Sequence, residues 1–366
     1  MHISRIDVRE VRNLKSVTLN CHGRANIIYG ENGSGKTSLL EAIHLLGRGR
    51  SFRHRDLRLV VNHAAEELVV SASFERIKAA RSQKLGVMRS RSGQFTARLD
   101  GSPLQTSAQL AELIPLQLID AHSFNLLEGG PLLRRQFLDW GVFHVEHSYT
   151  NLWRRFQKTL KQRNQLLRHG RIDEDLLKTW TAELVPLSEK ISSYRERYLS
   201  DLLGHAQTVA DAFDGLGKLE IEFYRGWKGD TSLAEIMDSQ IQRDISLGTT
   251  SQGAHKADAK IKVNGQLAAD SLSRGQIKLL VYALKLAQAT HYQDKTAESC
   301  VFLLDDLPAE LDYHHRQQVI DCLIGLKCQF FVTGVDRGDF EGLVNNCEHA
   351  MFHVEQGVVK SNWSKG

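Results

Sequence analysis

The chain has 366 residues, of which 42% are hydrophobic and 25% are charged, and its formal net charge is +4. These values are ordinary for a soluble globular protein, and so small a charge does not by itself indicate nucleic acid binding. The sequence shows no signal segment and no run long enough to cross a membrane, and its five cysteines lack zinc-site spacing. We therefore expect a cytoplasmic protein without a membrane partner.

The hydrophobic pattern predicts an α/β protein with a long helical interruption. Strands are expected within residues 2–29 and at 67–74, 95–99, 115–120, 219–223, 300–304 and 329–333. Residues from about 131 to 213 are helical in pattern, and a further helix is expected from about Tyr313. The simplest arrangement is a head made of residues 1–124 and 247–366, split by an inserted, mainly helical lobe of residues 125–246.

A glycine-rich segment follows the strand at residues 25–29 and precedes an apolar helical segment at 38–46. This context favours the phosphate-binding interpretation of G-x-x-x-x-G-K-[ST] over a chance glycine-rich turn. Glycines let successive N–H groups face the phosphates of a nucleoside triphosphate at the positive end of the helix dipole. Lys36 supplies a charge for the β- and γ-phosphates, and the Thr37 hydroxyl suits Mg²⁺. The predicted binding residues are Gly30, Glu31, Asn32, Gly33, Ser34, Gly35, Lys36, Thr37 and Ser38.

A second candidate site feature is the short apolar strand that ends at Asp305 and Asp306. The carboxyl end of a buried parallel strand is where α/β folds place ligands. Asp305 is expected to hold Mg²⁺ and Asp306 to orient or deprotonate the attacking water, as in a Walker B motif. A capped strand entering a turn is the alternative, but the phosphate-binding loop earlier in the chain favours catalysis.

The stretch from Leu272 to Gln276 opens a predicted helix with Ser273 as its N-cap. Taken alone it is an ordinary capped helix, but its place shortly before the Asp305 strand resembles the signature of ABC-type ATPases. Residues 309–312 resemble the D-loop that follows in this class. The resemblance implies an ATP-bound homodimer in which the signature of one copy, acting in trans, caps the γ-phosphate held by the other. The implied residues are Ser273, Arg274, Gly275, Gln276 and Asp312.

Several longer stretches resemble the bacterial RecF family within this class. They are residues 47–53, 124–140 and 273–276, together with Asn32 in the phosphate-binding loop. The resemblance covers nearly the full length and implies slow, DNA-stimulated ATP hydrolysis and binding to duplex DNA and gapped junctions. It also implies action beside RecO and RecR in loading RecA at gaps, in replication restart and in the SOS response.

Three positions depart from related patterns. Residues 253–256 read G-A-H-K where the family commonly has G-P-H-R, so that Lys256 lacks the bidentate geometry of arginine. Asp306 stands where transporter ATPases place glutamate, and this shorter carboxylate suits a slow, switch-like ATPase. Thr333 stands where transporters carry the switch histidine, and we expect it to sense the γ-phosphate only weakly.

Three further residues are candidates with open alternatives. Gln117 is expected to be the Q-loop glutamine, although a structural strand glutamine fits equally well. Arg12 and Asn13 resemble residues that contact phosphate or ribose in related heads, and an ordinary turn is the alternative.

Residues 151–171 carry seven basic residues and no acidic one, beside an apolar stripe of Trp153, Phe156, Leu160 and Leu167. Such a face can contact DNA phosphates without sequence preference, whereas a solvated charged face is the equally weighted alternative. The predicted DNA contacts are Arg154, Arg155, Lys158, Lys161 and Arg163; Arg168 and Arg171 complete the basic segment.

Two other ATPase classes make different demands on the sequence. An ATPase subunit of a membrane transporter needs a shorter segment between loop and signature and a surface for its membrane partner. An SMC-like linker needs long heptad arms, for which the predicted helices are too short. The remaining alternative is another SMC-like DNA-repair ATPase.

Overall fold

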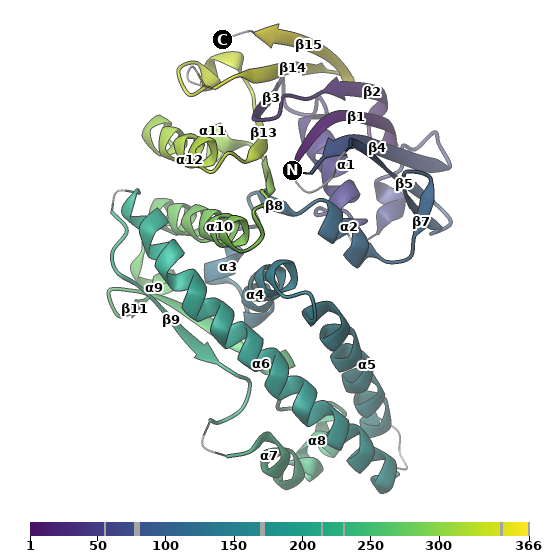
Figure 1. Cartoon of the computed structure of the whole chain (residues 1–366), viewed down its shortest axis with the longest axis vertical. Coiled ribbons are helices and arrows are strands. Elements are labelled where there is room, and N and C mark those ends of the chain that lie inside the picture. The colour runs from purple at the N-terminus through teal and green to yellow at the C-terminus, as the bar shows by residue number, and fades with distance from the viewer. Residues whose placement is uncertain are drawn as a thin grey trace. The chain divides into compact units, whose positions relative to one another are not determined.

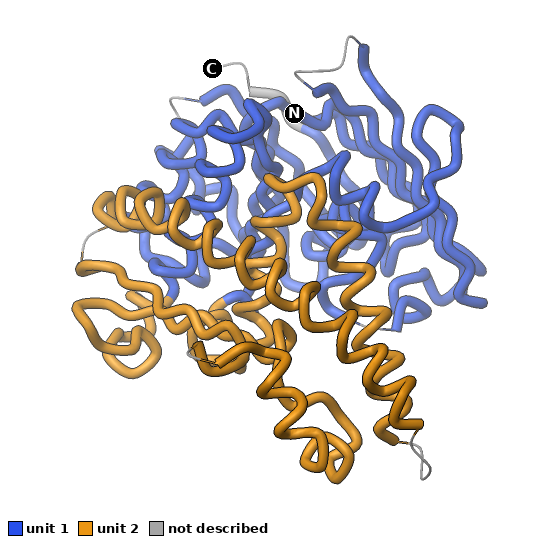
Figure 2. Tube along the Cα trace, turned by 60° about the horizontal axis from the view of Figure 1, so that its bottom comes forward, with its two compact units in different colours: residues 1–123, 278–366 blue, residues 124–277 orange. Residues whose placement is uncertain are grey.

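A computed structural model describes residues 1–54, 56–76, 81–168, 173–213, 215–229, 231–344 and 347–364 (Figure 1). The chain divides into two compact units, shown in different colours in Figure 2. We call residues 1–123 and 278–366 the head unit, and residues 124–277 the lobe unit. The lobe unit begins beside the expected boundary but extends past residue 246, so that it includes the signature stretch. The domain bounds given above stay a prediction.

The first sheet of the head unit is antiparallel and has the strand order β2-β1-β4-β5-β6-β7. Alternating residues of β1 and β4 are buried, so that one face of the sheet lies on the core. The strands are β1 (His2–Val11), β2 (Leu14–Asn20), β4 (Glu67–Glu75), β5 (Gln83–Ser90), β6 (Phe95–Leu99) and β7 (Ser102–Leu104). The sequence pattern did not predict β5, in which only Leu85 and Val87 are fully buried.

The second sheet of the head unit is mostly parallel and has the order β15-β14-β3-β13-β12-β8. Its strands are β3 (Ala25–Tyr29), β8 (Leu116–Ile119), β12 (Val301–Leu304), β13 (Gln329–Gly334), β14 (His349–Glu355) and β15 (Val358–Ser364). β12 and β13 are buried at every position, which explains why β12 is apolar throughout and β13 is apolar from Phe330 to Val332. The carboxyl ends of β8, β12, β13 and β3 lie at one edge, where the candidate site is built.

Helix α1 (Lys36–Arg48) shares one apolar core with both sheets of the head unit. Its residues from Ser38 to Gly47 are all buried, so that this helix is surrounded by protein. The other helical elements are η1 (Leu57–Leu59), α2 (Ser107–Leu113), α10 (Arg274–Thr296), α11 (Leu307–Glu310), α12 (Tyr313–Gly325) and η3 (Arg337–Phe340). α10 begins in the lobe unit and continues in the head unit.

The lobe unit is mainly helical, as the sequence predicts for residues 131–213. Its helices are α3 (Asn125–Glu128), α4 (Pro131–Val145), α5 (Tyr149–Arg168), α6 (Glu174–Asp211), α7 (Leu233–Ser239), α8 (Ile241–Leu247), η2 (Ala254–Lys256) and α9 (Ala268–Ser271). α6 has 38 residues and continues through Pro186, although proline usually kinks or breaks a helix. The small antiparallel sheet β11-β10-β9 consists of β9 (Leu219–Tyr224), β10 (Asp258–Val263) and β11 (Gln266–Leu267).

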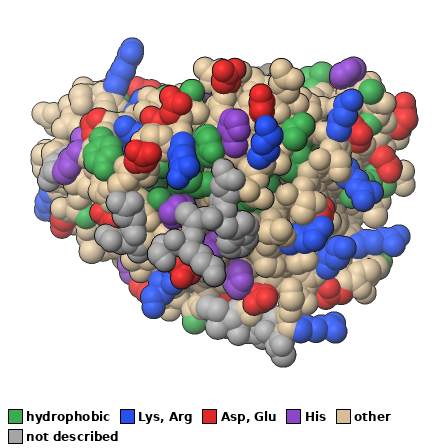
Figure 3. Space-filling model, turned by 90° about the horizontal axis from the view of Figure 1, so that it is seen from above, with side chains coloured by type: hydrophobic (Ala, Val, Ile, Leu, Met, Phe, Trp, Pro, Cys, Tyr) green, Lys and Arg blue, Asp and Glu red, His purple; other side chains and the backbone are tan. Residues whose placement is uncertain are grey.

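The surface and the thiols agree with the ordinary composition of the chain. Within the described ranges, every helix is too short or too polar to cross a membrane. Figure 3 shows basic and acidic side chains interspersed on the face seen from above, without a large patch of one sign. All five cysteines are free thiols.

Candidate functional site

The glycine-rich loop between β3 and α1 forms an open cradle of backbone N–H groups. Gly30, Gly33 and Gly35 have φ values of 151°, 80° and 122°, a region that side chains other than glycine rarely adopt. A Cβ atom at Gly33 would meet no atom within 4 Å, so the loop is open there. No side chain caps the N-terminus of α1. The N–H groups of its first turn are therefore available to an anion such as a phosphate.

Lys36 lies inside this loop and is largely buried, with 8% of its surface exposed. Its Nζ donates hydrogen bonds to the carbonyl oxygens of Gly30 at 2.6 Å and Glu31 at 3.0 Å. Burial lowers the pKa of Lys36, while the nearby carboxylates of Asp306 and Asp305 act to raise it. An ammonium held only by neutral carbonyls can gain energy by binding a phosphate, which is a stronger acceptor.

Asp305 lies at the carboxyl end of β12 and meets the first turn of α1. Its Oδ1 accepts hydrogen bonds from the hydroxyls of Thr333 at 2.9 Å and Thr37 at 3.1 Å. Burial raises the pKa of Asp305, although these two hydrogen bonds act to lower it. The fold thus brings together Thr37 and Asp305, the two residues that the sequence assigns to Mg²⁺ from opposite ends of the chain.

Asp306 and Thr333 form the support of this carboxylate. Asp306 has a φ of 53°, which is uncommon for a residue other than glycine, and its N–H donates to the Thr333 hydroxyl at 2.7 Å. The Thr333 side chain is fully buried, and its hydroxyl binds Asp305 on one side and Asp306 on the other. Its hydroxyl is thus engaged in positioning the two aspartates, and the expected weak sensing of the γ-phosphate by Thr333 stays a prediction.

Gln117 does not lie at the site edge, because it is two residues before the end of β8, opposite Phe302 in the middle of β12. Its buried side chain donates to Gln288 at 3.1 Å and accepts a hydrogen bond from Lys285 at 3.4 Å. The Q-loop interpretation is therefore wrong for this geometry, and the alternative of a structural strand glutamine holds.

Asp120, directly after β8, is a residue of the site edge that the sequence analysis did not single out. It directly follows the strand, as Asp305 follows β12, and the Asp305 N–H binds the Ile119 carbonyl at 2.9 Å. The Asp120 carboxylate is among the charges that raise the pKa of Asp305. Its signal in the sequence is the same as that of Asp305, a carboxylate directly after a short apolar strand.

Arg12 and Asn13 lie beside the loop and hydrogen-bond to α1 and to the loop backbone. The Arg12 guanidinium makes two hydrogen bonds, of 2.8 and 3.0 Å, to the fully buried Glu41 carboxylate. The Asn13 amide donates to the Ser34 carbonyl at 3.0 Å and accepts from the Ser38 hydroxyl at 3.1 Å. Both side chains are thus engaged with α1 and the loop, and their expected phosphate or ribose contacts stay a prediction.

Asp312 and the signature residues lie at two exposed helix starts. Asp312 caps α12 by accepting the His315 N–H at 3.0 Å, a hydrogen bond that lowers the pKa of Asp312. Ser273 accepts the Gln276 N–H at 3.4 Å, and the Gln276 side chain accepts the Ser273 N–H at 3.0 Å. Ser273, Arg274 and Gly275 are exposed. The signature is therefore accessible to a ligand from outside the lobe unit.

The basic segment on α5 divides into exposed residues and one buried residue. Arg154, Arg155, Lys158 and Lys161 are exposed, and Arg168 is exposed while donating to the Gly248 carbonyl at 3.2 Å. Arg171 lies outside the described residues. The expectation that Arg163 contacts DNA is wrong, because this side chain is fully buried and forms a 2.8 Å ion pair with Asp244. Arg163 falls on the same stripe as Phe156, Leu160 and Leu167, a spacing that could have revealed its burial.

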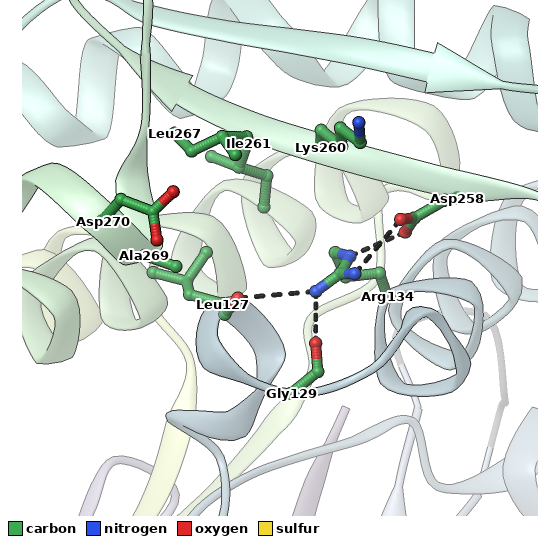
Figure 4. Close-up of a pocket in the computed structure, with 9 residues that line it drawn as sticks. All are labelled: Leu127, Gly129, Arg134, Asp258, Lys260, Ile261, Leu267, Ala269 and Asp270. Atoms are coloured by element: carbon green, nitrogen blue, oxygen red, sulfur yellow. Dashed lines mark hydrogen bonds and ion pairs between the residues drawn. The ribbon is translucent and has the colours of Figure 1, made fainter.

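A small pocket of about 160 Å³ lies in the lobe unit between α3, α4, α9 and the sheet (Figure 4). Arg134 lines it and makes two hydrogen bonds to Asp258, at 2.7 and 3.1 Å, and one to the Gly129 carbonyl at 2.7 Å. Its guanidinium is thus engaged within the lobe. Across the described ranges, no three His, Cys, Asp or Glu side chains are grouped to hold a metal. A Mg²⁺ ion bound by one carboxylate and substrate phosphates fits the Thr37–Asp305 pair without such a group.

The chain is similar in sequence to known proteins over nearly its full length. A family model described as the RecF/RecN/SMC N terminal domain matches residues 2–360. The chain is 47% identical to the DNA replication and repair protein RecF of Azotobacter vinelandii over 98% of each chain. It is 44% identical to the RecF protein of Pseudomonas aeruginosa, over 100% of this chain and 99% of that one.

Solved structures show the same likeness. A recombination mediator protein RecF-ATPrS of the RecFOR pathway matches with a TM-score of 0.87 at 27% identity, over 98% of both chains. A structure of RecF-ATP matches with the same TM-score at 26% identity. An Smc head bound to the C-winged helix domain of ScpA matches with a TM-score of 0.60 at 14% identity, which is a likeness of fold alone.

Proposed function

Because the chain belongs to the RecF family, we propose that it is an ATP-dependent, DNA-binding recombination mediator that dimerises when it binds ATP. Its fold is the α/β ATPase-head fold of RecF and SMC proteins, with an inserted, mainly helical lobe. The observation that carries the proposal is the meeting of Asp305 and Thr37 beside the open glycine loop that holds Lys36. These groups come from distant parts of the chain and have no evident joint purpose other than holding a nucleotide phosphate and its cation.

The proposed ATP site is the loop from Gly30 to Ser38, with Lys36 on the β- and γ-phosphates. Thr37 and Asp305 would hold Mg²⁺, which neutralises charge on those phosphates. Asp306 would orient the attacking water. Its carboxylate is shorter than the glutamate of transporter ATPases, which suits slow hydrolysis. We propose that DNA stimulates this hydrolysis. Support comes from the geometry above and from relatives described as RecF-ATP and RecF-ATPrS.

The proposed dimer places the exposed signature of one copy on the nucleotide of the other. Ser273, Arg274, Gly275 and Gln276 would act in trans on the γ-phosphate, with Asp312 close to the same site. A helix N-terminus suits this task because its unpaired N–H groups and its dipole attract an anion. ATP then serves as the switch that joins two copies.

The proposed nucleic acid ligand is duplex DNA, including gapped junctions. Arg154, Arg155, Lys158 and Lys161 form an exposed basic face that can follow phosphates. Work beside RecO and RecR, and through them on RecA, is proposed because a similar structure belongs to the RecFOR pathway. A protein that acts on chromosomal gaps works in the bacterial cytoplasm.

Light scattering with Mg²⁺ and ATP tests the dimer, and titration of gapped duplex DNA with and without ATP tests the mediator role. The wild-type chain should dimerise with ATP and bind DNA more tightly. Ser273→Arg should bind ATP as a monomer but fail to dimerise and to hydrolyse it. Ser271→Arg adds the same charge just before the signature and should behave like wild type. An ATP-induced dimer of Ser273→Arg would contradict the role in trans.

A further inference from the structure

The turn between β14 and β15 lies against the phosphate-binding loop, although some 300 residues separate the two segments. Gln356 and Gly357 have φ values of 49° and 80°, which describe a tight two-residue hairpin turn. The Gly357 N–H donates to the Ser34 carbonyl at 2.8 Å. A Cβ atom at Gly357 would lie 2.3 Å from the Asn13 carbonyl oxygen, so that no side chain fits there. The hairpin thus meets the loop through a backbone hydrogen bond, at a position where only glycine fits.

The Ser34 carbonyl is held from two sides. Besides the Gly357 N–H, the Asn13 side-chain amide donates to the same oxygen at 3.0 Å. Asn13 is itself fixed, because its Oδ1 accepts the Ser38 hydroxyl at 3.1 Å. β14 also supports the start of the loop, since a Cβ atom at Gly30 would lie 2.2 Å from the Val354 carbonyl oxygen. Two separate segments of the head unit therefore fix one peptide group of the loop.

The two hydrogen bonds to the Ser34 carbonyl determine the direction of the Gly35 N–H group. A trans peptide is planar, so that its C=O and N–H bonds point in opposite directions. When Gly357 and Asn13 hold the Ser34 oxygen on the outside, the Gly35 N–H must point to the opposite side, toward the interior of the loop. Gly35 can take this orientation because it has a φ of 122°. The N–H immediately before Lys36 is then presented to an anion without rearrangement.

We propose that the β14–β15 turn is a positioning element of the nucleotide site, in which the Gly357 N–H, together with Asn13, aims the Gly35 N–H at the nucleotide phosphates. This inference rests on the proposed function that the loop binds ATP. A group that is oriented before binding costs no ordering free energy when the ligand arrives, so affinity rises without any additional group touching the ligand. The hairpin at the C-terminal end of the head unit thereby sets the affinity for ATP.

Gly357→Ala tests the inference, with Gly101→Ala as the matched control. Gly101 also follows a residue with a φ of 49° in a two-residue hairpin turn of the head unit, and its own φ is 84°. A Cβ atom at Gly101 would meet nothing within 4 Å, so both variants share the backbone strain but only one disturbs the loop. We expect Gly357→Ala to raise the Kd and KM for ATP about tenfold, equal to ~1.4 kcal/mol, with kcat much less affected. Gly101→Ala should keep wild-type affinity.

Asn13→Ala provides a second, independent variant, because it removes the other donor and leaves the turn intact. It should weaken ATP binding in the same direction, and the double variant should lose less than the sum because both groups hold one oxygen. If Gly357→Ala fails to fold in thermal unfolding, Asn13→Ala carries the test. Wild-type ATP affinity in Asn13→Ala and Gly357→Ala, or equal losses in Gly357→Ala and Gly101→Ala, would overturn the inference. A wild-type chain that does not bind ATP would instead overturn the proposed function.

Discussion

The charged side chains of the candidate site in the head unit and the buried arginines of the lobe unit have different partners. In the head unit, Lys36 is held by two carbonyl oxygens, and Asp305 is held by the hydroxyls of Thr37 and Thr333. All of these partners are neutral, and burial shifts the pKa of Lys36 down and that of Asp305 up, against their charged forms.

In the lobe unit, each of three buried or mostly buried arginines meets a carboxylate. The ion pairs are Arg163–Asp244 at 2.8 Å, Arg195–Asp139 at 2.8 Å and Arg134–Asp258 at 2.7 Å. These charges are neutralised within the fold, so a ligand has nothing to add. A buried charge with only neutral partners thus indicates a binding site, whereas a buried charge beside an opposite charge indicates a structural ion pair.

The largest expected effect on stability comes from breaking the buried ion pair between Arg163 and Asp244 in the lobe unit. Asp244→Asn keeps the size and one acceptor oxygen of the side chain but leaves the fully buried Arg163 without a countercharge. The free energy of unfolding should fall by about 3–5 kcal/mol, measured by urea denaturation. Glu183→Gln makes the same chemical change in the exposed pair with Arg155, where the loss should stay below about 1 kcal/mol. Equal effects of the two variants would remove the distinction between the ion pairs.

Removing the Lys36 ammonium from the head unit should weaken ATP binding without lowering the stability of the fold. Lys36→Met is expected to lower the affinity for ATP by about 100-fold or more, because it removes a charge-assisted hydrogen bond to phosphate. The free energy of unfolding should not fall, since burial lowers the pKa of Lys36 and its charge is held at a cost in the folded state. Isothermal titration and thermal unfolding measure the two quantities, with Lys84→Met, an exposed lysine on β5, as the control. Unchanged ATP affinity would refute the loop assignment.

The residues of the candidate site and of the lobe unit differ in how far the sequence could predict their roles. Lys36 and Asp305 are readable because each lies in a local pattern, a strand followed by a loop or a carboxylate. The sequence leaves the role of Gln117 open because the register of β8 against β12, which places Asp120 and not Gln117 at the edge, depends on pairing between distant segments. The contact of Gly357 with Ser34 was invisible for the same reason. The burial of Arg163 can be predicted from its helical spacing on the apolar stripe, whereas its positive charge alone favours an exposed position.

The basic side chains of α5 form a third class, because they are exposed, although Arg155 also pairs with Glu183 at 3.1 Å. Changing Arg154, Arg155, Lys158 and Lys161 together to Ala should weaken binding to duplex DNA about tenfold at fixed salt. The slope of log K against log salt should also become shallower, by about 0.9 for each DNA phosphate that the variant no longer neutralises. As a control, Lys178→Ala with Lys190→Ala on the neighbouring α6 removes two exposed positive charges that lie outside this face. An unchanged slope in the fourfold variant would mean that this face is a solvated charged surface that does not contact DNA.

The smallest effect gives the sharpest contrast, because the substitution already used at Asp244 should have the opposite sign at Asp305. Burial raises the pKa of Asp305 above its value in the unfolded chain, so the native state binds this proton more tightly. Stability is therefore lost as the pH rises through the raised pKa, and the ionised carboxylate costs folding free energy at neutral pH. Asp305→Asn removes that cost, and its amide oxygen can still accept hydrogen bonds from Thr37 and Thr333. At neutral pH we expect a gain in the free energy of unfolding of up to about 1 kcal/mol, together with loss of ATP hydrolysis. The gain should vanish as the pH falls below the pKa of the wild-type carboxyl group. A loss of stability at neutral pH would mean that neutral partners satisfy a buried charge as well as an opposite charge does.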